Sequence, residues 1–245
     1  MSATAAPAKP ASLWEDFVDI FYAPTSVFAR RREGKFGIAL LVYVVLATGV
    51  WVAMRPMMQP IFDRMAAQTV TRARAQNPEL SDAQAQQIAR MQDKFTTGGV
   101  GAAVGFVTSA FFIFLVGVVL WAVAKLFDSS ASAGQAVMVA TYAFFPRLLG
   151  SVVGAVLLYL TPPEELTSMA SMTLSPGRFV DAEAQPVLAA FLARFDPFVL
   201  WTTVLLGIGI AVVGKTERGK GLAAAFTVWA LATLAAVGQV WSATA

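Results

Sequence analysis

The stretch Thr141-Tyr-Ala-Phe-Phe-Pro-Arg-Leu-Leu-Gly150 places a helix breaker and a permanent cation inside an apolar run that covers residues 136–160. A run of this length can cross a bilayer as a helix. Pro146 removes one backbone hydrogen bond from such a helix, and Arg147 costs roughly 2.5–3.5 kcal/mol at the centre of a membrane. The sequence therefore predicts that other groups satisfy the polar atoms at this point of the span.

Composition places the whole chain in the membrane class. Of the 245 residues, 57% are apolar and only 13% are charged, and the mean hydropathy is +0.65, whereas a soluble domain is about a quarter charged. The apolar runs predict five spans, at about 36–54, 100–126, 136–160, 198–213 and 222–241. We therefore predict an all-α fold, a polytopic membrane helical bundle with five transmembrane helices and a short N-terminal interfacial helix.

Two missing residue types limit the chemistry of the chain. The sequence contains no cysteine and no histidine, which excludes a thiolate nucleophile and removes the commonest general base and the commonest transition-metal ligand. The net charge of +3 is small, and the basic residues lie beside apolar spans, where topology explains them. We predict no enzyme: no catalytic residue, no cofactor, no metal site and no nucleic-acid partner.

Residues 1–35 form a predicted cytoplasmic segment with one short amphipathic helix. Ser12 and Glu15 have the spacing of a capping box at its start. Apolar side chains share one face of this helix and Asp16 and Asp19 lie on the opposite face, so we expect the helix to lie flat in the membrane interface. The residues predicted at the membrane surface are Trp14, Arg30, Arg31, Arg32 and Lys35. The arginine triplet is interpreted as a topogenic anchor, with an anionic-lipid or acidic-partner site as the alternative.

Residues 36–241 form a single predicted membrane domain. We expect Arg55 and two prolines to end the first span. The polar, helix-prone residues that follow predict an external helical hairpin at 57–95. A second connection, at 161–196, contains an apolar helix that starts at Pro186 and leads into the fourth span.

Two pairs of glycines have the spacing that lets transmembrane helices approach closely. Gly101 and Gly105 open the second span, and Gly150 and Gly154 follow the proline of the third. Small residues four positions apart lie on one face of a helix and remove the side chains that would hold a neighbour away. We predict helix packing at both pairs.

Arg147 needs a counter-charge that the predicted spans do not contain. No Asp or Glu lies within any of them, so the charge must come from a flanking segment, a lipid headgroup or a bound anion. Structural explanations are that Arg147 reaches along the helix to the interface, bonds freed carbonyls, or lies near an interface because the span is misplaced. The functional explanation is a polar site for an anionic lipid or solute, formed with Tyr142 and Pro146.

Three features of the chain resemble the Yip domain family, five-span membrane proteins named in eukaryotes as partners of Ypt/Rab GTPases. Asp19-Ile-Phe-Tyr-Ala-Pro24 is similar to an aromatic-x-Pro element of that family, and Tyr142-Ala-Phe-Phe-Pro146 is similar to its tyrosine-to-proline motif. The third feature is the five-span layout. Trp14-Glu-Asp-Phe and Asp196-Pro-Phe-Val-Leu-Trp201 look like the bacterial branch. This resemblance implies a membrane-embedded adaptor or organiser.

The predicted location is the bacterial inner membrane, with the N-terminus cytoplasmic and the C-terminus external. Basic residues at 30–35 and in the turn at 214–220 directly abut spans, and both segments lie inside only in this orientation. The predicted partners are membrane lipids and a membrane or cytosolic protein; the oligomeric state is left open.

The function predicted first is a non-enzymatic membrane organiser or adaptor for partner proteins. On this hypothesis, deleting residues 12–32 should remove a partner and leave the bundle intact. The alternative is a lipid or small-anion carrier or channel that uses a polar site around Arg147, because transport sites favour interrupted helices.

Overall fold

The computed structural model describes residues 12–96, 99–166 and 168–244, with only the backbone described at residues 92, 93, 95, 96, 163 and 244. These residues form helices and no strand, which confirms the all-α prediction. In chain order the α-helices are α1 Leu13–Asp19, α2 Pro24–Arg30, α3 Gly37–Gln76, α4 Asp82–Thr96, α5 Gly99–Lys125, α6 Ala133–Ala143, α7 Phe145–Leu160, α8 Pro186–Leu192, α9 Pro197–Gly214 and α10 Arg218–Thr244. Between α7 and α9 the described residues also form the short 3₁₀ helices η1 Pro163–Glu165, η2 Met169–Met172, η3 Pro176–Phe179 and η4 Ala193–Phe195.

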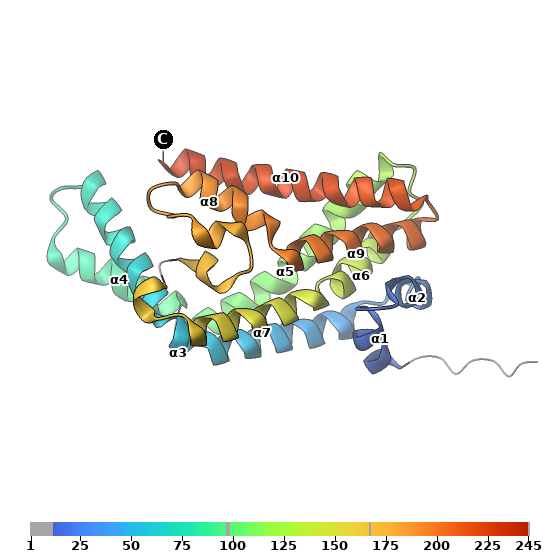
Figure 1. The fold of residues 1–245 in the computed structure, drawn as a ribbon, viewed down its shortest axis with the longest axis horizontal. Helices are drawn as coiled ribbons and strands as arrows, with labels where there is room; N and C mark the ends of the chain where they lie inside the picture. Colours follow the sequence, from blue (N-terminus) through green and yellow to red (C-terminus); the bar gives the residue numbers. More distant parts are fainter. Residues whose placement is uncertain (1–11, 97–98, 167, 245) are drawn as a thin grey trace, which may run out of the picture.

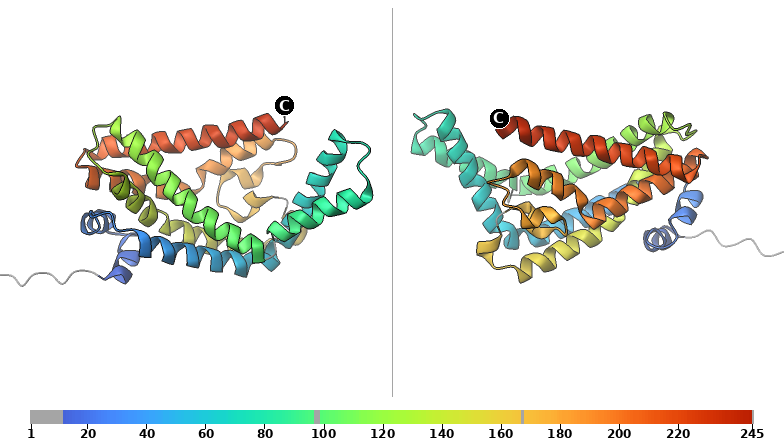
Figure 2. Two further views of the ribbon diagram at one scale, coloured as in Figure 1. Left: turned by 180° about the vertical axis from the view of Figure 1, so that it is seen from behind. Right: turned by 45° about the horizontal axis from the view of Figure 1, so that its top comes forward.

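Five segments of the described chain are long and apolar enough to cross a membrane. They are α3, α5, the α6–α7 pair, α9 and α10, and they run roughly along the long axis of the molecule (Figure 1). Helix α9 packs beside α10, and α7 packs beside α3 (Figures 1 and 2). Helix α6 lies at the centre, since every residue from Ala136 to Ala143 is buried. The predicted five-span helical bundle is therefore confirmed.

Helix α3 is longer than the sequence predicted. It continues through Pro56 and Pro60 to Gln76, although we expected the first span to end at about Met54. Packing explains the difference, because apolar side chains on both sides of the prolines are buried against the end of α7 and the segment after it. This cluster consists of Met54, Met58, Ile61, Phe62, Leu158 and Leu166. A helix of 40 residues is about 60 Å long, about twice the hydrocarbon thickness of a bilayer.

The last part of α3 and helix α4 form a helical hairpin that projects from one end of the bundle (Figures 1 and 2). Arg74 pairs with Asp82 at 2.6 Å across the bend. Ser81 and Gln84 form a capping box at the start of α4, since the backbone N–H of each residue donates to the side chain of the other. The hairpin expected at 57–95 is thus helical, but its first arm is a continuation of the first span.

The third span is interrupted at Phe144. Helix α6 ends at Ala143 and α7 begins at Phe145, and Phe144 between them keeps near-helical angles of φ −81° and ψ −15°. The backbone N–H of Arg147 donates to the carbonyl of Phe144 at 2.9 Å. Pro146 lies in the first turn of α7, where its missing N–H removes no helical hydrogen bond. The span therefore consists of two helices joined end to end.

The connection between α7 and α9 folds back against the bundle. Figure 1 shows it between α7 and one half of α10. The indole N–H of Trp229 in α10 donates to the carbonyl of Arg194 at 3.2 Å. Helix α8, the apolar helix expected from Pro186, also packs on α10. The described residues of this connection are therefore part of the bundle and not only a link between two spans.

Glycines of the third span allow close approaches. A Cβ atom placed on Gly150 would lie 2.8 Å from the ring of Phe198, in α9. A Cβ atom on Gly154 would lie 2.6 Å from the carbonyl oxygen of Met172, in η2. The predicted close contacts exist at this pair, but only Gly150 faces another spanning helix.

The predicted packing of Gly105 does not occur within the described chain. No heavy atom lies within 4 Å of the position that its Cβ would take, and Gly105 and Gly101 both line an open cleft. The close approach of α5 to α6 occurs instead at Gly117, where a Cβ would lie 2.5 Å from Cα of Val137. Gly117 has no small partner four residues away, so its role gives no GxxxG signal in the sequence.

Replacing Gly117 by alanine should destabilise the protein by about 1–3 kcal/mol, because the added methyl group meets the backbone of α6. The matched control, Gly105→Ala, should leave stability unchanged, since open space surrounds its Cβ position. Unfolding of the purified protein in detergent measures both variants. Equal losses of stability would contradict this packing.

Candidate functional site

Two separate clusters of polar side chains lie next to the interruption of the third span. The first, which we call the N-terminal ionic cluster, consists of Asp16, Asp19, Arg30 and Arg31. The second, which we call the arginine cavity, is a cavity of about 270 Å³ whose lining includes Arg147, Arg194 and Asp196.

The N-terminal ionic cluster ties α1 to α2. Asp16 is fully buried and pairs with Arg30 at 2.6 Å and with Arg31 at 2.5 Å. Arg30 also pairs with Asp19 at 2.5 Å. The hydroxyl of Tyr22 and the guanidinium of Arg30 hold the pKa of Asp19 below its usual value. The two acidic side chains therefore hold the start of the basic segment in place.

Aromatic rings dock this segment on the interruption. The ring of Phe17 stacks on Phe145 with 4.7 Å between centroids and lies 6.2 Å from the ring of Tyr142. Phe21 meets Trp201 of α9 edge to face at 5.6 Å. Tyr142 is fully buried, and its hydroxyl has no hydrogen-bond partner within the described residues. Because Phe17 belongs to α1, its contact with Tyr142 shows that Tyr142 faces the N-terminal segment.

Residues of the N-terminal segment belong to the main core. Ile20, Val27 and Phe28 are fully buried and pack in the same cluster as α6 and α9. Deleting residues 12–32 would therefore remove part of this core, so that deletion is not a clean test of partner binding. Asp16 also differs from the prediction that placed it on the exposed face of α1, since Arg30 and Arg31 pair with it.

Asp16→Asn should destabilise the protein by about 2 kcal/mol. The substitution leaves two guanidinium groups without their shared carboxylate, and the partial exposure of both arginines keeps the loss below that of a fully buried pair. The control is Glu33→Gln, which breaks the exposed pair with Lys35 and should change nothing measurable. Unfolding in detergent at neutral pH measures both. A loss no larger in Asp16→Asn than in the control would contradict a structural role for the cluster.

The arginine cavity lies between α7, the connection and α9. Arg147 projects from α7, with its Cζ atom 5.4 Å from the centroid of the Phe144 ring. Arg194 comes from η4, and its Nε atom donates to the hydroxyl of Thr233 at 3.4 Å. Both arginines also line a second cavity of about 50 Å³ toward α5 and α10. Two cations thus line the same cavity.

Among the described residues that line this cavity, Asp196 carries the carboxylate. Its oxygens accept hydrogen bonds from backbone N–H groups. It caps α9 by accepting from the N–H groups of Phe198 at 2.8 Å and Val199 at 3.4 Å, and it accepts from Leu174 at 3.0 Å. Within the described residues neither Arg147 nor Arg194 forms an ion pair. The cavity therefore carries one net positive charge.

The structure separates the three residues predicted as one site. Arg147 lines the arginine cavity, whereas Tyr142 contacts the N-terminal segment through Phe17. Pro146 is buried in the first turn of α7. A ligand in the arginine cavity would meet Arg147 but not the Tyr142 ring.

The five residues predicted at the membrane surface divide into two groups. Trp14 is 71% exposed, and Lys35 pairs with Glu33 on the surface. Arg32 donates from Nε to the carbonyl of Ala29 at 3.2 Å. Arg30 and Arg31 instead bind Asp16 in the ionic cluster.

Sequence reasoning missed Arg194 and Asp196 as cavity residues. Asp196-Pro197 has the pattern of a helix cap followed by a first-turn proline. This pattern indicates a structural role and gives no sign that Asp196 also lines a cavity. Arg194 is the single charge in an apolar helix next to a span, a signal of the same kind as Arg147. Within the chain that the structure describes, no group of acidic side chains could hold a metal ion.

The spans and the interrupted third helix define a multi-pass helical membrane protein. Comparison with protein families matches the Yip1 domain over residues 18–238. Since the match covers most of the chain, the protein belongs to the Yip1 domain family, as the resemblance predicted. Comparisons with curated proteins and with solved structures found no match.

Proposed function

We propose that this protein is a non-enzymatic organiser of the bacterial inner membrane that recruits partner proteins through the exposed face of α1 and of the turn that follows it. The observation that carries the proposal is an aromatic face that the chain holds in a fixed position. Trp14 is 71%, Val18 60% and Tyr22 72% exposed, although the same segment contributes buried residues to the core. An exposed apolar face of this kind marks an interaction surface.

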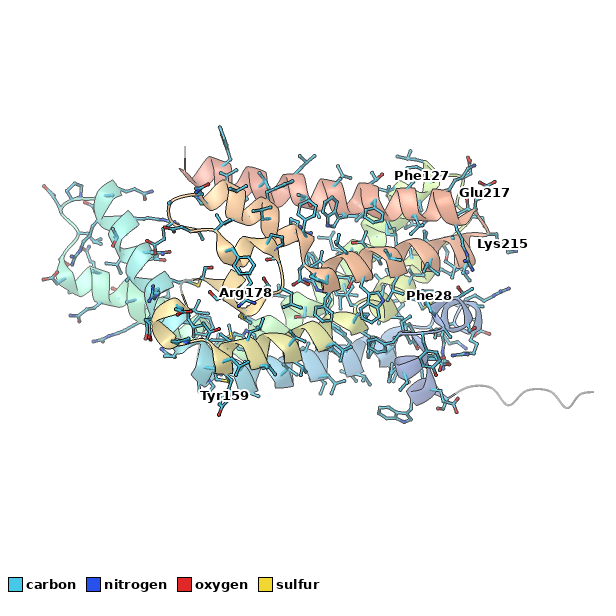
Figure 3. The ribbon with its side chains drawn as sticks, viewed as in Figure 1. Phe28, Phe127, Tyr159, Arg178, Lys215 and Glu217 are labelled. Atoms are coloured by element: carbon cyan, nitrogen blue, oxygen red, sulfur yellow. The ribbon has the colours of Figure 1, made fainter. Side chains whose placement is uncertain are left out.

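The proposed orientation has the N-terminus in the cytoplasm and the C-terminus outside. Segments that carry basic residues gather at one end of the bundle. Gln135 donates to the carbonyl of Arg32 at 2.7 Å, and Lys220 pairs with Asp128 at 2.6 Å. Figure 3 shows Lys215 near the same end. A basic end next to spans favours the cytoplasmic side.

Photo-crosslinking from position 14 tests the adaptor. A photoreactive amino acid replaces Trp14, and cells are irradiated with the protein in its native membrane. We expect one defined protein adduct, because the face points away from the bundle. Adding Val18→Ala should reduce that adduct without changing the stability of the bundle, since Val18 is 60% exposed and lies outside the core.

The matched control places the photoreactive amino acid at Leu126, which is 80% exposed in the turn after α5. It should not give the same protein adduct. If position 14 gives only lipid adducts, the face of α1 contacts the membrane and the adaptor proposal fails.

A second candidate function is a carrier for a lipid or a small anion. The observation that favours it is the arginine cavity, where Arg147 and Arg194 face one space beside an interrupted helix. Transport sites use such interruptions near the middle of the membrane.

A further inference from the structure

We propose that Arg147 and Arg194 bind the phosphate of an anionic membrane lipid, and that an acyl chain of this lipid lies in the neighbouring cleft between α3, α5 and α7. This proposal rests on the second candidate function, the carrier, and names the ligand of its site. It requires only that the lipid binds, so a protein that binds the lipid without transporting it would still fit the proposal.

The first argument is charge. A guanidinium in hydrocarbon is costly, and polar or ionised side chains there pair with other groups. Among the described contacts, the guanidinium of Arg147 lies over the face of the Phe144 ring, and Nε of Arg194 donates one long hydrogen bond to Thr233. The oxygens of Asp196 accept from three backbone N–H groups. Most of the ten N–H donors of the two guanidinium groups are therefore available to an anion from outside the chain.

The second argument is depth. Arg147 lies about 21 Å along the α6–α7 span from Ala133, and Thr233, the partner of Arg194, lies about 22 Å along α10 from Arg218. Both distances start from the same end of the bundle, since the hydroxyl of Ser130 donates to the carbonyl of Gly214 at 2.8 Å. The two arginines thus lie at a similar distance from that end, along the part of the spans that would be inside a membrane.

The third argument is geometry. An arginine presents a planar fork of donors that matches a carboxylate or a phosphate. A carboxylate offers two oxygens in one plane, which one fork can occupy. A phosphate has several oxygens around one centre, so two forks from different segments can bind it together. Arg147 from α7 and Arg194 from η4 line the same cavity, which suits the second case.

The fourth argument is the apolar cleft beside the cavity. It has a volume of about 460 Å³ and is lined mainly by α3 and α5, including Trp51 and Val104. Ser151 and Met172 line both the cleft and the arginine cavity, so the two spaces are neighbours. A cationic cavity next to an apolar cleft fits a ligand with a charged head and an apolar chain.

Binding of phosphatidylglycerol to the delipidated full-length protein tests the proposal, with native mass spectrometry in detergent as the readout. Arg147→Gln and Arg194→Gln should each lower the affinity by about tenfold or more, because each removes charge-assisted hydrogen bonds. Phosphatidylcholine, which has no net charge, should bind more weakly than phosphatidylglycerol to the wild type.

Gly105→Leu tests the chain cleft without touching the arginines. Its Cβ has no atom within 4 Å, and the rest of the side chain enters a cleft of about 460 Å³, so we expect the variant to fold. We expect weaker binding of phosphatidylglycerol and an unchanged response to inorganic phosphate, measured as a thermal shift. The matched controls are Gly49→Leu, which adds the same side chain to open space outside the cleft, and Arg178→Gln. Arg178 belongs to the same connection and stacks on Phe179 away from the cavity.

Equal binding of phosphatidylglycerol to the wild type and to folded arginine variants would overturn the proposal. Arginine-dependent binding of inorganic phosphate with no effect of Gly105→Leu would overturn the lipid assignment and indicate a free anion. If the arginine variants do not fold, unchanged lipid binding in Gly105→Leu is the overturning result. Lipid binding without transport in proteoliposomes would contradict the carrier function but would still support this binding site.

Discussion

The interruption of the third span at Phe144 is the constraint on which the surrounding structure depends. Inside a bilayer every backbone polar group needs a partner within the protein, and Pro146 supplies no N–H. The chain meets this constraint by starting a new helix there, with Arg147 bonded back to Phe144. Aromatic rings then close around the junction, with Phe17 from α1 and Tyr43 from α3 both against Phe145.

The interruption gives the two ends of one short motif different neighbours. Tyr142 packs against the N-terminal segment, which makes residues outside the spans part of the core. Arg147 lines a cavity that the connection and α9 complete. The stretch from Tyr142 to Pro146 is thus a structural junction, and Arg147 just after it forms no ion pair within the described residues. The match to the Yip1 domain covers residues 18–238, which include α2 and the junction at Phe144.

The sequence was sufficient for the features that depend on local pattern. Apolar run length predicted five spans, and the spacing of Ser12 and Glu15 predicted a capping box that forms. Features that depend on tertiary packing were not predictable. Packing against α7 carries α3 through Pro56, and Asp16 is buried only because α2 folds back over α1. Arg194 joins Arg147 only because the connection folds into the bundle, which no periodicity in the sequence shows.

Paired cysteines test the central claim, that the N-terminal segment docks on the interrupted span while Arg147 faces away from it. The chain has no native cysteine, so every crosslink within it comes from the two introduced cysteines. With a short thiol crosslinker in native membranes, Phe17→Cys should crosslink to Phe145→Cys within one chain. It should not crosslink to Arg147→Cys, because residues two apart on a helix do not share a face. No crosslink at the first pair, with both cysteines reactive, or equal crosslinking of the second pair, would contradict the account.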